Sequence, residues 1–341
     1  MKQSFNRRRF ITTATAASIA AGLSGSLPKL YGKNLEENQA KVGIIGLDTS
    51  HSVAFTKSLN AADPAAELKG YKVVAAYPKG SNDIESSVKR IPGYSEEVKK
   101  LGVEIVGSIE DLLKKTDVVL LETNDGRLHL EQALLVLKAS KPMFIDKPVA
   151  ASLSDVIAIY TTAKQYNVPV FSSSSLRFMQ SVQEVVKGKA GAVLGADTYS
   201  PATLEKTHPD LFWYGIHGVE ILFSVMGTGC KEVTRIHTND TDIVVGTWKD
   251  GRVGTFRGTR TGTHDYGGTV YGEKGNISLG PFNGYDSLLI QIIEFFKTGK
   301  APVSSEETLE IYAFMEAADE SKRKSGAPVS LEFVIQKAKK K

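Results

Sequence analysis

Two side chains in this sequence, a lysine and a histidine, stand where acid–base chemistry is possible. Lys147 follows the short apolar run Met143–Ile145, which predicts a strand, and Pro148 comes directly after it. A residue before proline is held extended, so Lys147 should project from the carboxyl end of its strand, where ligands bind in open α/β sheets. His217 lies at the start of an apolar helical pattern, and imidazole exchanges protons near neutral pH. A solvated strand end and a packed core histidine also explain these residues, so their role depends on the elements around them.

A strand, a glycine turn and a helix open the first predicted domain. Lys41–Leu47 is a continuous apolar run, as in buried parallel strands, and a helical pattern follows it. This order is typical of dinucleotide-binding units, although the second glycine of their G-x-G-x-x-G turn is Asp48 here and the third is His51. A carboxylate at that position would repel phosphate, unless Asp48 caps the helix instead. We predict that the cofactor contacts of this turn come from Gly46, Asp48, Thr49, Ser50 and His51.

Strands and helices continue to alternate up to residue 174, which predicts a doubly wound parallel sheet. Further strands are expected at Tyr71–Tyr77, Val103–Val106, Val118–Glu122, Met143–Ile145 and Pro169–Ser172. The second strand is followed by Lys79 and Ser81 rather than by an acidic residue, which favours a 2′-phosphate, as in NADP, although a plain surface loop explains this equally well. Ser86–Leu101 is predicted as a helix broken near Pro92.

After residue 174 the pattern changes to a long apolar helix from Ile216 and then to consecutive short strands. We expect these strands at Val233–His237, Asp242–Trp248, Arg252–Thr259, Gly267–Tyr271 and Asn276–Leu279, and helices at Tyr285–Lys297 and Ser305–Ser325. The fold class is therefore α/β. It combines an N-terminal Rossmann domain with a doubly wound parallel sheet, residues 41–174, and a C-terminal α+β domain with an open, mostly antiparallel sheet, residues 175–335.

Two motifs resemble those of the glucose–fructose oxidoreductase/inositol dehydrogenase (Gfo/Idh/MocA) family. Asp146-Lys147-Pro148 is similar to the family's Glu-Lys-Pro motif, and Trp213–Glu220 is similar to its Asp-x-Gly-x-His-x-x-Asp helix start. The resemblance covers residues 41–331. It implies that a nicotinamide cofactor, NAD or NADP, binds the first domain. It also implies that Lys147 orients the reacting hydroxyl while His217 exchanges its proton.

The resemblance assigns the other contacts of the site as well. The loop after the strand Val118–Glu122 would pass the ribose and diphosphate of the cofactor. Further cofactor contacts are assigned to Thr123, Asn124, His129, Asp146 and Lys147. Trp213 replaces the family's first aspartate, and its indole offers a stacking face to a sugar, while Tyr214 offers a hydroxyl for acid–base catalysis. Packing explains both aromatic residues equally well, and Arg177 has the alternative of bridging the two domains. Predicted substrate contacts are Arg177, Trp213 and His264, and no metal ligands are predicted.

The first 32 residues form a predicted export signal and linker outside the folded domains. Arg7 and Arg8 precede an Ala/Thr-rich run, as in the twin-arginine signals of proteins exported in the folded state, which implies a periplasmic location. That run is too short to span a bilayer, and no cysteine follows it to carry a lipid anchor. The net charge of +4 over 341 residues, without a basic surface pattern, argues against a nucleic-acid partner. A single cysteine, Cys230, excludes an intrachain disulfide framework.

The predicted function is that of an NAD(P)-dependent oxidoreductase that transfers hydride to or from a sugar, cyclitol or sugar derivative. A periplasm without free nucleotide favours a tightly bound cofactor, and the resemblance favours a homo-oligomer. Two alternatives stay open at this point. One is redox-neutral cleavage of glycosides by a bound nicotinamide, and the other is carbohydrate binding without a cofactor, which Asp48 and Trp213 favour.

Overall fold

The structure is a computed structural model that describes residues 39–263 and 265–340. The predicted export signal, residues 1–32, and His264 lie outside the described residues. Within the described part, no helix combines the length and the apolar character that crossing a membrane requires.

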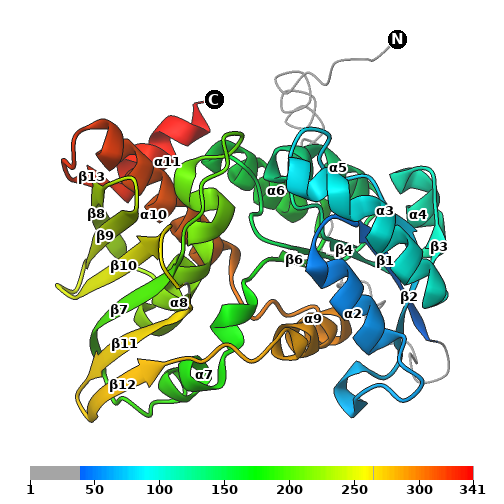
Figure 1. Cartoon of the computed structure of the whole chain (residues 1–341), viewed down its shortest axis with the longest axis horizontal. Helices are drawn as coiled ribbons and strands as arrows, with labels where there is room; N and C mark the ends of the chain where they lie inside the picture. The colour runs from blue at the N-terminus through cyan, green and yellow to red at the C-terminus, as the bar shows by residue number, and fades with distance from the viewer. Residues whose placement is uncertain (1–38, 264, 341) are drawn as a thin grey trace, which may run out of the picture. The chain divides into compact units, whose positions relative to one another are not determined.

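The first sheet has six parallel strands in the order β3-β2-β1-β4-β5-β6 (Figure 1). These strands are β1 (Ala40–Ile45), β2 (Tyr71–Tyr77), β3 (Glu104–Ile105), β4 (Val118–Leu121), β5 (Met143–Ile145) and β6 (Val170–Phe171). Apolar runs such as Val118–Leu121 are fully buried, as expected for parallel strands covered on both faces, so the predicted parallel sheet is confirmed. The strand order reverses between β1 and β4, and in doubly wound sheets the ligand crevice lies at that reversal.

Helices connect the strands of this sheet. They are α2 (Ser50–Leu59), η1 (Ala66–Leu68), α3 (Glu85–Lys100), α4 (Ile109–Lys115), α5 (Gly126–Lys138) and α6 (Leu153–Tyr166). Helix α3 continues through Pro92, so the predicted break is wrong. Proline has no N–H, so the carbonyl of Val88, four residues earlier, lacks its usual helical partner. Both residues are exposed, and water can therefore bond this carbonyl. Helix α5 begins at Gly126, because the Asp125 side chain caps it, and His129 therefore lies within its first turn.

The second sheet has seven strands in the order β12-β11-β7-β10-β9-β8-β13. These are β7 (Val193–Pro201), β8 (Cys230–His237), β9 (Thr241–Trp248), β10 (Val253–Thr259), β11 (Gly267–Gly272), β12 (Gly275–Leu279) and β13 (Val329–Ser330). Neighbouring strands are antiparallel except for the parallel pair β7–β10, which confirms the predicted open, mostly antiparallel sheet. Strand β7 lies inside the sheet and was not predicted, since its residues are mostly small or polar.

Helices pack against the second sheet (Figure 1). The helices after residue 174 are η2 (Ser175–Phe178), α7 (Gln180–Val186), the π-helical turn η3 (Leu211–Gly215), α8 (Ile216–Met226), α9 (Asp286–Thr298), α10 (Ser305–Arg323) and α11 (Leu331–Lys339). Helix α8 packs on β7 and β10, and α10 packs on β8. Gly218 allows this close approach, because a Cβ there would lie 2.3 Å from the ring of Phe256.

Helix α9 returns from the second sheet to the first domain. In Figure 1 it is the orange helix beside α2, and a hydrogen bond of 3.2 Å from Ser58 Oγ to Asp286 Oδ1 joins the two helices. The buried side chains of Leu288 and Ile292 belong to the same apolar core as Val42 of β1. Burial of each such side chain contributes about 1.5–3 kcal/mol, so this packing holds the chain after the second sheet against the Rossmann domain.

Candidate functional site

Lys147 lies at the carboxyl end of β5, at the sheet edge predicted from the sequence. It follows Asp146, whose Oδ1 accepts a hydrogen bond of 2.8 Å from the Lys147 backbone N–H. His129 supports this end of the sheet, because its ring nitrogens lie 2.6 Å from the Thr123 carbonyl oxygen and 3.1 Å from that of Val149. His129 is fully buried and connects the loops after β4 and β5, which positions the segment that carries Lys147.

His217 lies in the first turn of α8, in the second domain. Its Nδ1 is 2.8 Å from the hydroxyl of Ser174, which lies where the chain leaves the first sheet. Burial, and after it the positive charge of Lys147, lowers the pKa of His217 well below its ordinary value. The imidazole is therefore neutral at physiological pH and able to accept a proton.

Lys147 and His217 line the same cavity, which has a volume of about 300 Å³. Residues from the first domain that line it are Thr49, Ser50, His51, Ser86, Arg90, Tyr94, Asn124 and Lys147. Residues from later in the chain that line it are Ser175, Leu176, Thr203, Trp213, Tyr214, His217, Tyr266, Phe282 and Tyr285. The fold therefore brings predicted cofactor, catalytic and substrate residues of both domains into one cavity.

Aromatic side chains dominate the cavity wall formed by the later part of the chain. The hydroxyls of Tyr214 and Tyr266 are 3.2 Å apart, and both rings contact His217 edge-on, with centroids 5.1 Å and 5.7 Å away. The ring of Tyr285 lies 4.4 Å from that of His51. Apolar faces combined with hydroxyl groups suit a ring that carries many hydroxyls. Tyr266 and Tyr285 were not predicted as site residues, because no local sequence pattern marks residues that meet only across a cavity.

Asp48 lies behind the cavity lining and is fully buried. Its Oδ1 accepts a hydrogen bond of 2.9 Å from the Asn124 N–H, and its Oδ2 accepts one of 3.2 Å from the Ser81 N–H. Burial nevertheless raises the pKa of Asp48. The cap of α2 is Thr49, whose hydroxyl accepts from the His51 N–H, so the alternative that Asp48 caps this helix is wrong. Asp48 instead joins the loops after β1, β2 and β4.

Several predicted contacts do not line the cavity. They are Gly46, Asp48, Thr123, His129, Asp146 and Arg177. Gly46 has a φ of +91°, and a Cβ there would lie 2.5 Å from the backbone of Thr123, so the turn requires glycine. Arg177 is buried and forms ion pairs of 3.0 Å with Glu220 and 2.7 Å with Glu307. This placement favours a structural role for Arg177, and substrate contact by it stays a prediction.

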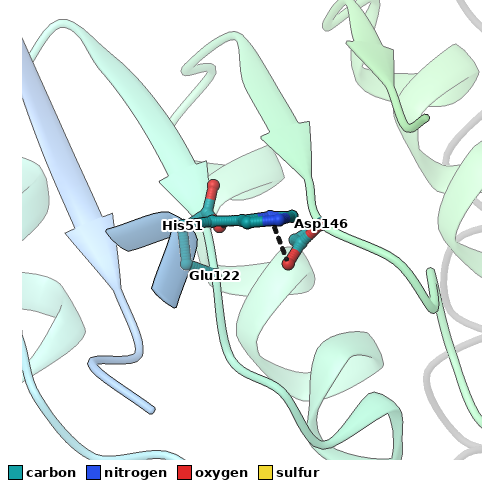
Figure 2. Close-up of side chains that lie close together, drawn as sticks. All are labelled: His51, Glu122 and Asp146. Atoms are coloured by element: carbon teal, nitrogen blue, oxygen red, sulfur yellow. Dashed lines mark ion pairs between the residues drawn. The ribbon is translucent and has the colours of Figure 1, made fainter. Parts of the chain in front are cut away.

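A buried cluster beside the cavity was not predicted from the sequence. Figure 2 shows the side chains of His51, Glu122 and Asp146, which converge from the start of α2 and from the ends of β4 and β5. His51 Nδ1 lies 3.1 Å from Asp146 Oδ2 and 4.0 Å from Glu122 Oε2. Among the described residues, neither oxygen of the Glu122 carboxyl has a hydrogen-bond partner, and this residue has no exposed surface. The available signal was an acidic residue directly after a buried apolar strand.

The two carboxyl groups of this cluster differ in protonation. Burial, followed by the charge of Asp146, raises the pKa of Glu122 well above its ordinary value. Burial acts in the same direction on Asp146, but the neighbouring charges of His51 and Lys147 outweigh it and hold the pKa of Asp146 at about 2. Buried acids that share one site commonly separate in this way, because two adjacent negative charges repel each other.

Residues 40–174 match the model of the GFO_IDH_MocA family, described as the oxidoreductase family with an NAD-binding Rossmann fold. The first domain is therefore similar to the NAD-binding Rossmann domain of this oxidoreductase family. The resemblance inferred from the motif around Lys147 is confirmed for these residues. No curated protein matches the chain.

Solved structures share the fold over most of the chain. A probable dehydrogenase from Thermotoga maritima is 22% identical, with a TM-score of 0.70 over 86% of this chain and 100% of its own. Scyllo-inositol dehydrogenase from Lactobacillus casei, with bound NAD(H) and scyllo-inositol, is 18% identical, with a TM-score of 0.70 over 86% and 100%. Myo-inositol dehydrogenase from Lactobacillus casei, in complex with NAD(H) and myo-inositol, is 17% identical, with a TM-score of 0.67 over 85% and 96%. At these identities the similarity establishes the fold.

The edge of the first sheet fits a nicotinamide dinucleotide. The glycine turn at Gly46 and the N-terminus of α2 form the usual phosphate-binding start of such a domain. A second cavity of about 350 Å³ lies beyond β2, where the adenosine of a dinucleotide binds in this fold. Its lining includes Lys79 and Gly80, whereas Ser81 is already bonded to Asp125 at 2.9 Å. The glycine turn itself is unusual, because Asp48 takes the place of the second glycine of the dinucleotide-binding pattern.

Proposed function

We propose that this protein is an NAD(P)-dependent oxidoreductase that acts on a cyclitol, a sugar or a sugar derivative. The observation that carries the proposal is the cavity in which Lys147 of the Rossmann domain and His217 of α8 meet beside hydroxyl and aromatic groups. The family of the first domain supports oxidoreductase chemistry. Two neighbours of the same fold are inositol dehydrogenases that bind NAD(H) and inositols, which supports a polyhydroxylated substrate.

The side chains of this cavity have complementary tasks in such a reaction. The nicotinamide accepts or returns the hydride when it is bound. Lys147 donates a hydrogen bond to the reacting hydroxyl and stabilises the negative charge that develops on its oxygen. Neutral His217 accepts the hydroxyl proton, while the contact between its Nδ1 and Ser174 orients the ring. Trp213 and Tyr214 supply a stacking face and a further hydroxyl.

The decisive experiment identifies the nucleotide first and the substrate second. Purified full-length protein is denatured, and the released nucleotide is analysed by absorbance and mass spectrometry. The protein is then incubated with NAD or NADP and a panel of cyclitols, sugars and glycosides while the reduced cofactor is measured. We expect a bound or tightly binding nicotinamide dinucleotide and its reduction by at least one polyhydroxylated compound. Cleavage of a glycoside without net reduction would identify the redox-neutral alternative.

Carbohydrate binding without a cofactor is the second candidate, and the position of Asp48 favours it. Its carboxyl group is bonded to the loops after β2 and β4, where the phosphates of a dinucleotide would pass. The same experiment separates the two functions. Sugar binding in calorimetry, with no nucleotide released and no affinity for added NAD or NADP, would replace the oxidoreductase by a binding protein.

We further propose a periplasmic location and self-association. The location is supported by Arg7 and Arg8 and the Ala/Thr-rich run that follows them in the sequence. Self-association is supported by the face of the second sheet opposite α8 and α10, because large apolar side chains on several of its strands are exposed. These are Tyr199, Ile236, Val253 and Tyr271. Apolar groups gathered on an open face are typical of contact surfaces between proteins.

A further inference from the structure

We propose that His51, Glu122 and Asp146 bind one divalent metal ion of the Mn²⁺, Fe²⁺ or Zn²⁺ class at the carboxyl edge of the first sheet. This site goes beyond the proposed oxidoreductase function and does not depend on it. One imidazole and two carboxylates are a ligand set that suits first-row divalent ions. The three side chains come from three separate elements, which converge where the strand order reverses.

The positions of the donor atoms agree with such an ion. The facing donor atoms of the cluster all lie within 4.8 Å of one another (Figure 2). Ligands at about 2.0–2.2 Å from a metal are about 3 Å apart when adjacent and about 4 Å apart when opposite. His51 Nδ1 is 3.1 Å from Asp146 Oδ2 and 4.0 Å from Glu122 Oε2, so small side-chain shifts bring all three to bonding distance.

The hydrogen bonding of the carboxyl groups leaves one oxygen of Asp146 and both oxygens of Glu122 for a ligand. Asp146 Oδ1 accepts from the Lys147 N–H and Asp146 Oδ2 forms the ion pair of 3.1 Å with His51 Nδ1, whereas neither oxygen of the buried Glu122 carboxyl has a hydrogen-bond partner among the described residues. A buried polar atom without a partner costs about 1–3 kcal/mol, and more when it is charged. Two such atoms on the fully buried Glu122 carboxyl, facing His51 and Asp146, therefore indicate a missing ligand rather than a packing defect.

The charges around Glu122 indicate the sign of that ligand. The charged groups that act on Glu122 are the carboxylates of Asp146 and Asp48 and the ammonium of Lys147. The acidic groups of Glu122, Asp146 and Asp48 thus outnumber the ammonium of Lys147 and the imidazole of His51, so this buried site favours a cation. An anion would be repelled by the same carboxylates, and a lone proton would leave the second oxygen of Glu122 unpaired.

The site is also placed so that an ion can act on a substrate. His51 belongs to both the cluster and the lining of the cavity that contains Lys147. Three protein ligands leave further coordination positions for water or for vicinal hydroxyls of a polyol. An ion there would bind and orient hydroxyl groups close to the residues proposed to transfer the proton.

The test is metal binding by the full-length protein, with Mn²⁺ and Zn²⁺ as the probes. The protein is treated with a chelator, and metal binding is then followed by calorimetry, by electron paramagnetic resonance for Mn²⁺ and by thermal melting. We expect one equivalent to bind and the melting temperature to rise by roughly 5 °C at about 100 times the dissociation constant. Glu122→Gln and Asp146→Asn should each weaken binding at least ~10-fold.

The variants distinguish a ligand role from a structural one. Glu122→Gln removes a buried acid without changing its shape, so the metal-free variant should melt at or above the wild-type temperature while losing the rise caused by metal. Glu332→Gln, on the exposed surface of α11, is the matched control and should bind metal as the wild type does. Absence of metal binding by the wild type, or unchanged binding by Glu122→Gln, would overturn the proposal. Stabilisation by NAD or a polyol but not by either metal would also overturn it, because hydroxyl donors would then satisfy the cluster.

Discussion

Ser174 Oγ lies 2.8 Å from His217 Nδ1, so the end of the first domain holds the imidazole of α8 at the cavity. Because Nδ1 is engaged in this contact, Nε2 is the nitrogen left for proton exchange with a substrate. Lys147 lines the same cavity. Burial is the main cause of the lowered pKa of His217, and the positive charge of Lys147 lowers it further. The two proposed catalytic residues are thus coupled electrostatically although they belong to different domains.

This coupling predicts that the effects of removing Lys147 and His217 do not add. Lys147→Ala and His217→Ala should each lower turnover at least ~10²-fold, the usual scale of acid–base catalysis, and the double variant should be little worse than the poorer single one. Turnover on an identified substrate is measured together with melting temperature and nucleotide content, which should stay near wild type. Near-normal activity of His217→Ala would transfer the proton role to Tyr214.

Asp48 provides a test of the unusual cofactor turn. Asp48→Gly removes a carboxylate from the turn where the phosphates of a dinucleotide would bind. It also leaves the N–H groups of Ser81 and Asn124 without their acceptor. We expect nucleotide affinity to hold or improve, while the melting temperature falls because two hydrogen bonds are lost. Calorimetry with NAD and NADP measures the affinity, and Asp48→Asn serves as the control that keeps an acceptor without the charge. A sharp loss of affinity in both variants would instead make Asp48 a direct contact of the cofactor.

His208 should make the protein less stable in mild acid. Its Nε2 accepts a hydrogen bond of 3.1 Å from the Gly126 N–H at the start of α5, so this nitrogen carries no proton in the folded state. Burial lowers the pKa of His208 to about 4, against about 6.5 for an unfolded histidine. The unfolded chain therefore binds the extra proton first, and the stability from this group is complete above pH 6.5 and is lost as the pH falls toward 4.

The size of this effect follows from the difference in pKa and reaches about 3 kcal/mol near pH 4. Urea unfolding at several pH values measures it. His208→Gln keeps an acceptor for the Gly126 N–H but does not titrate, so its stability should decline less between pH 6.5 and 4. An identical pH dependence in the variant and the wild type would show that His208 does not control this transition.

Arg177 is expected to act on stability more than on substrate binding. Arg177→Met leaves the buried Glu220 and the half-buried Glu307 unpaired and should lower the free energy of unfolding by about 3 kcal/mol. The double variant with Glu220→Gln should recover part of this loss, since it removes one of the stranded charges. Unfolding in urea and the KM of an identified substrate are measured for both variants. A raised KM without loss of stability would restore Arg177 as a substrate contact.

Export can be tested through the two adjacent arginines of the leader. Replacing Arg7 and Arg8 with lysine should retain the protein in the cytoplasm, because the twin-arginine route depends on these residues. Cell fractionation and immunoblotting measure the distribution, and Lys2→Arg is a control that alters a basic residue outside the pair. An unchanged periplasmic yield of the paired variant would contradict the assignment of this signal.

The sequence by itself determined most of the strands and helices and the position of Lys147 at the end of a strand. Continuous apolar runs such as Val118–Leu121 identify buried parallel strands, because alternate residues of a strand face opposite sides and both sides are covered. The position of Lys147 at a sheet edge was predicted from its neighbours as well. It follows the strand Met143–Ile145 and precedes Pro148, which holds it extended. Patterns of this kind depend on neighbours in the chain, so they can be recognised without the fold.

Only the tertiary structure decided which side chains at the ends of these strands and helices lie next to each other. Glu122 and His51 are far apart in sequence and become neighbours because β1 and β4 are adjacent where the strand order reverses. The ion pairs of Arg177 with Glu220 and Glu307 likewise form because α8 and α10 pack beside its guanidinium, while its contact with substrate stays a prediction. Such contacts depend on the order of strands and the packing of helices, which place loops together irrespective of their separation in the chain, and this is why local patterns did not reveal them.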